Sequence, residues 1–293
     1  MPSTPDHPTL VTGASSGIGR AIALRLAREG WPVYASARRI DAIGDLAEHG
    51  CQLLCLDVTD EASREAAVAR IEKDHGAVGA LVNNAGFGQQ GPLEETPLQA
   101  IRAQFETNVF AAIALCQRVL PGMRRARTGR IVNVSSMGGR LSFPGGAAYH
   151  GSKYALEAMT DVLRFEVAGF GIGVVIIEPG PTNTGFGSAS IRALDALPRV
   201  EGGAYDHFRD GIRRALESTF NAAPDPGAST PEEVADAVWA GLSAPDPEPR
   251  VVVGETARQL IDLKEGGTAR EWDRIVAGMY PRPGKDAQER DAD

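Results

Sequence analysis

Short runs of β-branched and apolar residues alternate with longer amphipathic stretches along most of the chain. The short runs predict strands, and the longer stretches, in which apolar positions recur with the helical period, predict helices. We expect strands near residues 9–11, 33–37, 52–56, 80–83, 130–135, 173–177 and 250–253. We expect helices near residues 18–29, 61–74, 98–125 and 149–168. Several strands are apolar throughout, which is typical of a parallel sheet covered by helices on both faces.

The repeated strand–helix–strand pattern predicts an α/β fold: a doubly wound, Rossmann-type sheet of seven parallel strands with helices on both faces. The sequence shows no second core, so we interpret residues 1–293 as a single domain. The last residues, 281–293, are polar and predict a disordered tail.

The alternation stops after Pro179 and Gly180. Residues 183–228 hold one amphipathic segment, 205–220, within sequence rich in Gly, Pro and Ser. Because a long segment outside the sheet of a compact domain is usually functional, we expect a substrate lid inserted in the C-terminal part of the domain. Residues 230–233, Thr-Pro-Glu-Glu, form a capping box that predicts the start of a further helix.

Composition narrows the class of partner. Hydrophobic residues make up 43% of the chain and charged residues 23%, as in ordinary globular proteins. The formal net charge is -8, and no basic patch stands out, so a nucleic-acid partner is not expected. The start of the chain lacks the features of a signal peptide, and no apolar run approaches the roughly 20 residues that span a bilayer. We therefore expect a cytoplasmic protein without a membrane partner.

The chain has three cysteines, Cys51, Cys55 and Cys116. An odd number without C-x-x-C spacing speaks against a disulfide framework and against a metal site. We interpret all three as small buried apolar residues.

A glycine-rich turn follows the first strand and opens the first helix; its residues are Gly13, Ala14, Ser15, Ser16, Gly17, Ile18 and Gly19. Backbone N–H groups without neighbouring Cβ atoms can approach a pyrophosphate, and the helix dipole favours its negative charge. The spacing is G-x-x-x-G-x-G instead of the commoner G-x-G-x-x-G. Because such turns also occur for structural reasons alone, the motif by itself leaves both interpretations open.

Two further segments follow strands of the predicted sheet. Asp57 and Val58 come after the third strand, and Asn84, Ala85 and Gly86 come after the fourth. Ligands of doubly wound sheets lie over the carboxyl ends of the strands, so these residues support a cofactor site. In the alternative interpretation, Asp57 caps a turn and the asparagine joins loops, and both roles can hold at once.

Tyr149 and Lys153 share one face of a predicted helix. An ammonium about 4 Å from a phenol, at an effective dielectric of ~20, contributes up to ~4 kcal/mol. We therefore expect Lys153 to lower the pKa of Tyr149 from ~10 toward ~7. Ser136 follows the strand at 130–135 and is placed to hydrogen-bond a substrate oxygen. Asn108 lies inside a helical run, where its low propensity suggests a kink or a bound water.

Seven segments in this order and spacing resemble the short-chain dehydrogenase/reductase family, single-domain branch: TGASSGIG, Asp57, NNAG, Asn108, the VSS strand end, YHGSK and PGPTNT. The resemblance covers about residues 9–186. It implies that Ser136 orients the carbonyl and that Tyr149 transfers the proton. It also implies that Lys153 lowers the tyrosine pKa and holds the nicotinamide ribose, while Asn108 keeps a water in the proton relay.

The PGPTNT segment supplies Pro179, Gly180, Thr182 and Thr184 to the expected cofactor site, and Thr184 matches the family's carboxamide-binding threonine. The resemblance thus implies an oxidoreductase that moves a hydride between a nicotinamide and a carbonyl or secondary alcohol carbon. The alternative is a catalytically silent NADP(H)-binding sensor or regulatory protein, but such a protein would be expected to lose the tyrosine or the lysine. An epimerase or dehydratase of the extended branch would be expected to carry TGxxGxxG and a larger C-terminal domain.

The second strand ends in Ala37-Arg38-Arg39. Folds that prefer NAD carry an acid at this strand end for the ribose 2′-hydroxyl, and by family alignment that position is Ala37. A guanidinium there binds a 2′-phosphate, so we expect NADP(H) to be preferred over NAD(H), through Arg38 first and Arg39 second. A solvated surface arginine is the alternative, and we expect Asp41 to cap a helix that opens at Ala42.

The expected substrate is a small, lipophilic ketone or secondary alcohol, because the predicted pocket segments supply Phe87, Met137, Leu141, Phe143, Phe186, Tyr205 and Phe208. These side chains alternatively only pack the lid. The segments VYASARR and EPGPTNTGF most resemble the 17β-hydroxysteroid dehydrogenase-like subgroup, whose members act on varied substrates.

His150 is interpreted as a surface residue of its helix and Arg140 as a solvated loop residue. Helices 98–125 and 149–168 correspond to those that pair subunits in relatives, which implies a homodimer or homotetramer.

Overall fold

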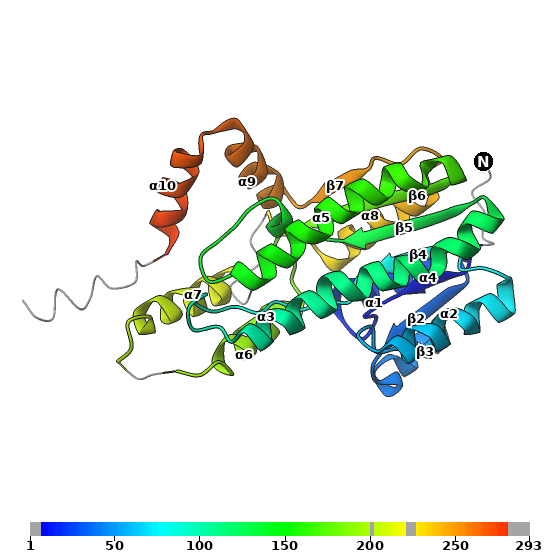
Figure 1. The fold of residues 1–293 in the computed structure, drawn as a ribbon, viewed down its shortest axis with the longest axis horizontal. Helices are drawn as coiled ribbons and strands as arrows, with labels where there is room; N and C mark the ends of the chain where they lie inside the picture. Colours follow the sequence, from blue (N-terminus) through cyan, green and yellow to red (C-terminus); the bar gives the residue numbers. More distant parts are fainter. Residues whose placement is uncertain (1–6, 200–201, 221–226, 281–293) are drawn as a thin grey trace, which may run out of the picture.

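The structure is a computed structural model that describes residues 7–199, 202–220 and 227–280. Its centre is a sheet of seven parallel strands in the order β3-β2-β1-β4-β5-β6-β7 (Figure 1). The strands are β1 (Thr9–Val11), β2 (Val33–Ala37), β3 (Gln52–Cys55), β4 (Ala80–Asn83), β5 (Gly129–Val134), β6 (Ile172–Pro179) and β7 (Arg250–Val253). The predicted fold class is confirmed, and the strand order reverses between β1 and β4, where ligands of such sheets bind.

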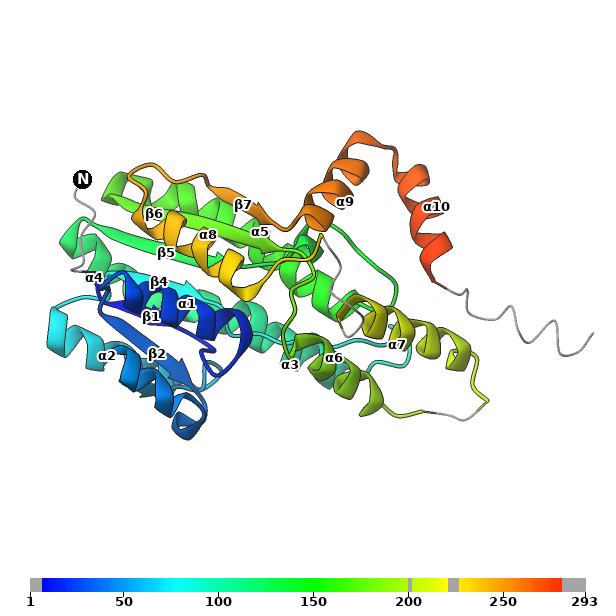
Figure 2. The same ribbon diagram turned by 180° about the vertical axis from the view of Figure 1, so that it is seen from behind.

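Helices cover both faces of the sheet. The helices α2 (Glu61–His75), α4 (Ala111–Ala126) and α5 (Ala147–Val167) cover one face, and α1 (Gly17–Arg28) and α8 (Pro231–Ser243) cover the other, which Figure 2 shows from behind. Alternate strand residues enter the two layers: Leu10 packs in the core with α2 and α4, and Val11 in the core with α1 and α8. This double coverage explains why the strands are apolar on both faces.

The helix expected at 98–125 is interrupted at the predicted place. It consists of α3 (Leu98–Phe105), a π-helical turn η2 (Glu106–Phe110) and α4. Asn108 is the middle residue of this turn and is buried. Turns of this kind inside helices often occur at functional sites.

The segment 183–228 contains two helices instead of the single one expected. In addition to α7 (Asp206–Phe220), part of the sequence that is rich in Gly, Pro and Ser forms α6 (Phe186–Asp195). The alanines of α6 favour a helix, and packing against α7 offsets the weak propensity of its glycine and serines. Residues 200–201 and 221–226 of this segment, and the predicted tail 281–293, lie outside the described residues.

Two helices that were not expected follow β7: α9 (Glu255–Gly266) and α10 (Ala269–Met279). The capping box predicted at Thr230 is present, since the Thr230 hydroxyl accepts from the Glu233 N–H and the Glu233 carboxylate accepts from the Thr230 N–H. Thr268 and Glu271 form a second capping box at the start of α10. Both views show α9 and α10 projecting from the body beyond β7.

Two smaller expectations are wrong. The helical segment after β2 is the 3-10 segment η1 (Ile40–His49), so Asp41 lies in its first turn and does not cap a helix at Ala42. Cys51 and Cys116 are buried as expected, but Cys55 is exposed because it lies on the edge strand β3. Among the described residues, no helix is long and apolar enough to cross a membrane.

Candidate active site

A cavity of about 1260 Å³ opens over the carboxyl ends of the strands. Its wall contains most residues of the expected cofactor site: Gly13, Ser15, Ser16, Gly17, Ile18, Gly19, Arg38, Asp57, Val58, Asn84, Ala85, Gly86, Pro179, Gly180, Thr182 and Thr184. It also contains Ser136, Tyr149 and Lys153 of the expected catalytic group. Segments far apart in the sequence therefore meet in one cavity.

The glycine-rich turn is shaped by close backbone approach. Gly13 and Gly17 have φ of 70° and 53°, which a residue with a side chain rarely adopts. A Cβ at Gly19 would lie 2.3 Å from the Gly13 carbonyl oxygen and 2.4 Å from Nδ2 of Asn84. Ser16 precedes α1 without a side-chain cap, so the first N–H groups of the helix face the cavity wall uncapped. These features fit an anionic phosphate group.

Asn84 and Asp57 have the structural roles that the sequence left open. Asn84 Nδ2 donates to the Thr12 carbonyl (2.9 Å) and joins the β4 loop to the glycine turn. Asp57 Oδ1 accepts from the Thr59 backbone (2.9 Å) and hydroxyl (2.7 Å), and these bonds, together with the charge of Arg38, lower the pKa of Asp57. Both residues also line the cavity, so each can join the loops through its hydrogen bonds and contact a ligand at the same time.

Ser136 and Tyr149 meet in the wall of the cavity. Ser136 follows β5, and its Oγ accepts a hydrogen bond from the Gly138 N–H (3.0 Å), which turns the chain into the short helix η3 (Met137–Gly139). Tyr149 lies in the first turn of α5. Burial raises the pKa of Tyr149 to about 12, and a smaller effect, a hydrogen bond with the Ser136 side chain, lowers it.

Lys153 lies one turn after Tyr149, but its charge is not directed at the phenol. Its Nζ donates to the Val134 carbonyl (2.9 Å) and lies 6.0 Å from the centroid of the Tyr149 ring. Burial lowers the pKa of Lys153 to about 8, against the opposing charge of Glu157. The expectation that Lys153 draws the Tyr149 pKa toward neutrality is wrong for this geometry, because desolvation of both groups outweighs their interaction.

Asn108 joins the π-helical turn to the loop after β4. Its Oδ1 accepts from the Phe87 N–H (3.2 Å), and its Nδ2 lies within hydrogen-bond distance of the Phe87 carbonyl (3.1 Å) and of Ser152 Oγ (3.2 Å). Gln104 also donates to the Phe87 carbonyl (2.7 Å). Asn108 does not line the main cavity; it lies behind its wall, together with Lys153, in a minor pocket.

The remaining residues expected to bind the cofactor differ in whether they line the cavity. Arg38 lines the cavity, whereas Arg39 does not and is exposed. Thr184 packs against the glycine turn, since a Cβ at Gly17 would lie 3.0 Å from its methyl group. Thr182 pairs with Ser229 (2.7 Å), which ties the segment after β6 to the segment before α8.

Four of the seven apolar pocket residues that were expected line the cavity: Phe87, Met137, Phe143 and Phe186. Leu141 instead packs with Ile261 and Trp272, and Tyr205 and Phe208 pack with Leu194 and Ile212. Residues that sequence reasoning missed complete the wall, and they come from α7, α9 and the end of α10: Ile212, Leu216, Phe220, Leu260, Met279 and Tyr280. The capping box at Thr268 was the signal that could have revealed α10.

His150 is not a surface residue of its helix, contrary to expectation. It is buried, lines the cavity, and its Nδ1 lies 3.0 Å from the Gly138 carbonyl oxygen. It belongs to a series of aromatic rings, with neighbouring centroids 5.4 to 5.9 Å apart, that connects α10 to α7 through the cavity wall: Trp272, Phe143, His150, Tyr149, Phe186 and Phe220.

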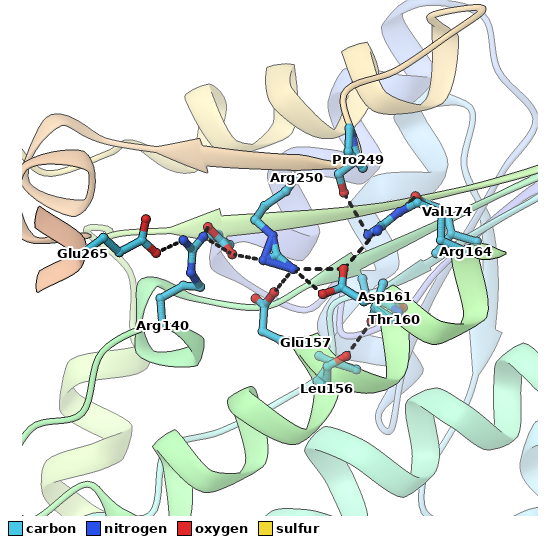
Figure 3. A network of polar contacts seen from close by, with 12 residues as sticks. Arg140, Leu156, Glu157, Thr160, Asp161, Arg164, Val174, Pro249, Arg250 and Glu265 are labelled. Atoms are coloured by element: carbon cyan, nitrogen blue, oxygen red, sulfur yellow. Dashed lines mark hydrogen bonds and ion pairs between the residues drawn. The ribbon is translucent and has the colours of Figure 1, made fainter. Parts of the chain in front are cut away.

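Arg140 is an ion-pair residue instead of a solvated one. Figure 3 shows its guanidinium beside Glu265 of α9. Arg140 also approaches the fully buried carboxylate of Glu178 to 3.3 Å. Arg250 approaches Glu178 (3.4 Å) from the other side and also pairs with Glu157 of α5 (3.1 Å). Burial raises the pKa of Glu157 to about 7. This network fastens the loop after Ser136 to β6, β7, α5 and α9.

Known proteins share this architecture. The model for the short chain dehydrogenase family matches residues 8–194. A 3-ketodihydrosphingosine reductase of Bacteroides thetaiotaomicron is 40% identical over 209 residues, which are 71% of this chain and 74% of the relative. Human 17-beta-hydroxysteroid dehydrogenase type 1 is 33% identical over 268 residues, which are 87% of this chain and 80% of the relative. The crystal structure of a short-chain dehydrogenase from Streptomyces avermitilis is 34% identical, covers 92% of this chain and 97% of its own, and superposes with a TM-score of 0.75. Sequence motifs, sheet order and these matches agree, and the chain belongs to the short-chain dehydrogenase family of oxidoreductases.

Proposed function

We propose that the protein is an NADP(H)-dependent oxidoreductase that transfers a hydride between the nicotinamide and a carbonyl or secondary alcohol carbon, with Tyr149 as the general acid/base. The observation that carries the proposal is the meeting of Ser136, Tyr149 and Lys153 in the same cavity as the glycine turn. A catalytically silent binding protein would have no need of a polar serine–tyrosine pair at the far end of a nucleotide cavity. The bound cofactor supplies or accepts the hydride.

The residues of this chain handle the oxygen and the proton. Ser136 holds the substrate oxygen through its hydroxyl, beside the Tyr149 hydroxyl. Because the pKa of Tyr149 is raised to about 12, its phenol is protonated at neutral pH and suited to donate a proton as negative charge develops on a carbonyl oxygen. Lys153 lies behind the tyrosine as a buried proton carrier whose pKa of about 8 is close to neutrality.

Arg38 supports the preference for NADP(H). It is exposed at the end of β2 and lines the cavity beside Ala37, where folds that prefer NAD have an acid. A guanidinium at this position binds a 2′-phosphate through charge-assisted hydrogen bonds. Pro179, Gly180, Thr182 and Thr184, which follow β6, also line the cavity, and we assign Thr184 to the carboxamide.

The substrate end of the cavity favours a lipophilic molecule. Its wall carries aromatic and aliphatic side chains from η3 and the loop after it, and from α6, α7 and α9, including Phe143, Phe186, Leu216 and Leu260. The names of two relatives, a 3-ketodihydrosphingosine reductase and a 17-beta-hydroxysteroid dehydrogenase, are in keeping with this class. Segment 183–228 acts as the lid, and α9 and α10 close the opposite side.

A panel of steroids, retinoids, aromatic ketones and small sugars, each assayed with NADPH and with NADH, tests this proposal. NADPH oxidation should depend on a lipophilic ketone. Activity confined to sugars would overturn the substrate class. Tight NADPH binding without turnover on any member of the panel would favour the silent binding protein.

We further propose that the protein is a homodimer or homotetramer that pairs through α4 and α5. Large apolar side chains on the outer face of α5 are exposed, and Phe165, at 81% exposure, is the most extreme. Met159 and Val162 lie on the same stretch of helix, and Phe110 is exposed at the start of α4. Contiguous exposed apolar patches on a soluble protein mark interaction surfaces.

A further inference from the structure

Two uncharged polar side chains lie together in the substrate end of the cavity, where most of the wall is apolar. His150 is next to Tyr149 on α5, and Gln90 is in the loop after β4. Both side chains line the cavity although each residue is only 8% exposed. Neither has a role in the proton transfer described above.

The hydrogen bond of His150 determines which ring nitrogen can accept. Nδ1 lies 3.0 Å from the Gly138 carbonyl oxygen, and because a carbonyl can only accept, Nδ1 carries the hydrogen. In a neutral imidazole the other nitrogen, Nε2, then presents a lone pair. Burial, as the largest effect, lowers the pKa of His150 below its ordinary value; the hydrogen bond to Gly138 opposes this, and the charge of Lys264 lowers the pKa further, so the neutral form is favoured at pH 7.

Nε2 of His150 and the amide of Gln90 converge over Gly146. A Cβ at residue 146 would lie 2.5 Å from Nε2 and 3.3 Å from Oε1 of Gln90, so both polar atoms lie beside the Gly146 backbone. The Gly91 N–H donates to the Gly145 carbonyl (2.7 Å) and holds the two loops together there. Within the described ranges neither Nε2 nor the Gln90 amide forms a hydrogen bond, and neither is sealed from the cavity.

An imidazole acceptor beside a carboxamide, which carries both an acceptor oxygen and a donor NH2, matches a hydroxyl group, which donates to Nε2 or Oε1 and accepts from the carboxamide NH2. Because neither side chain is charged, the pair suits a hydroxyl better than an ammonium or a carboxylate. The His150 ring is 5.6 Å from the Tyr149 ring, which places the hydroxyl close to the reacting carbon.

We propose that His150 and Gln90 form a specificity site for a hydroxyl group that lies within a few bonds of the reacting carbonyl carbon. The substrate is then a lipophilic hydroxyketone, or the corresponding diol in the oxidative direction. This inference rests on the proposed ketone reduction and names its substrate class more closely. Hydrogen-bonding pockets of this kind reject analogues that lack the matching group, because the polar groups of the protein are then left unpaired.

The test compares kcat/KM with NADPH for a long-chain α-hydroxyketone, its β-hydroxy isomer and the methyl ether of each. The wild-type protein should prefer at least one hydroxyketone over its ether by about tenfold or more. His150→Phe and Gln90→Leu should each reduce this preference severalfold while they retain activity on the ether. Leu216→Ala, which alters the apolar wall instead, should lower kcat/KM for ether and hydroxyketone alike and leave the preference unchanged.

The outcomes separate the two proposals. Equal use of hydroxyketone and ether by the wild-type protein overturns the specificity site but leaves the ketone reduction standing, and this comparison needs no variant to fold. A preference that survives both His150→Phe and Gln90→Leu overturns it as well. If no ketone of the series is reduced, the proposed function fails, and the specificity site fails with it.

Discussion

Lys153 and Tyr149 occupy successive turns of α5, yet the lysine ammonium is bonded to the Val134 carbonyl and lies 6.0 Å from the centre of the tyrosine ring. The shared helix face brings the two residues together, as their spacing predicts. Burial then acts on each of them in the direction that opposes charge, so the phenol keeps its proton and the ammonium releases its proton more easily.

Tyr149→Phe should reduce kcat by at least ~10²-fold, because it removes the proton donor while it preserves the ring. NADPH affinity should be unchanged, since the glycine turn and Arg38, which we propose to hold the other end of the cofactor, are not altered. Turnover and fluorescence titration measure the two quantities. Tyr154→Phe is the matched control: Tyr154 is on the same helix, but its hydroxyl bonds to the Arg140 carbonyl outside the cavity, so this variant should keep its activity. Wild-type turnover in Tyr149→Phe would refute the mechanism.

Arg38→Ala should bring the affinities for NADPH and NADH together. One charged contact of ~1.5 to 3 kcal/mol corresponds to a preference of roughly 10- to 150-fold in the wild-type protein. Titration of both reduced cofactors at fixed ionic strength gives this ratio, because salt screens such contacts. Arg39→Ala should have the smaller effect, since Arg39 does not line the cavity. Equal affinities in the wild-type protein would contradict the assignment.

Glu157→Gln should change the pH dependence of stability. The folded-state pKa of about 7 is above the ordinary glutamate value of 4.5, so between these values the folded protein holds a proton that the unfolded chain has released. Above pH 7 the buried carboxylate is ionised in the folded protein, and it destabilises the fold by its full amount. As the pH falls from 7 toward 4.5 the folded protein takes up the proton, and this destabilisation is lost. The free energy of unfolding of Glu157→Gln, relative to that of the wild type, should therefore be higher at pH 8 than at pH 5 by up to about 3 kcal/mol.

Urea unfolding at the two pH values measures this difference. Glu265→Gln is the control, because it removes a half-exposed carboxylate from the same network, and pairs of that kind contribute under ~1 kcal/mol. If the difference between Glu157→Gln and wild type is the same at both pH values, Glu157 is ionised throughout and the assignment is wrong.

Phe165→Glu should dissociate the proposed oligomer, because it places a charge in the centre of the exposed apolar face of α5. Light scattering at micromolar concentration measures the mass. Leu263→Glu, a comparable change at a half-exposed site on α9, should leave the assembly intact. A monomeric wild-type protein would show that α5 does not pair subunits.

The sequence predicted those parts of the fold that local pattern determines. Fully apolar runs such as 80–83 identified the strands, and the residues that follow them, including Asn84 and Ser136, met at one edge of the sheet as expected. Helix α6 escaped detection because the glycine and serines near its start have weak helix propensity, and its packing against α7 compensates for them. Leu141 and Phe208 were expected in the pocket wall but pack in the core instead, because periodicity does not reveal which neighbour covers a side chain. The pKa of Tyr149 was misjudged for a similar reason. The spacing of the sequence shows that Lys153 is near, but it does not show that Tyr149 is buried, and burial raises the pKa.

The π-helical turn at Asn108 has a consequence for chain length. The helix before it is held through Gln104, which bonds to the Phe87 carbonyl, and the helix after it is held by Leu115 and Val119 in the sheet core. Because a π turn holds one residue more than an α turn, deleting one residue between 106 and 110 would let the two helices join as one continuous α-helix with both anchors kept. The position from which Asn108 reaches the backbone of Phe87 would be lost with it. The extra residue of this turn therefore serves the contact of Asn108 rather than the packing of the helix.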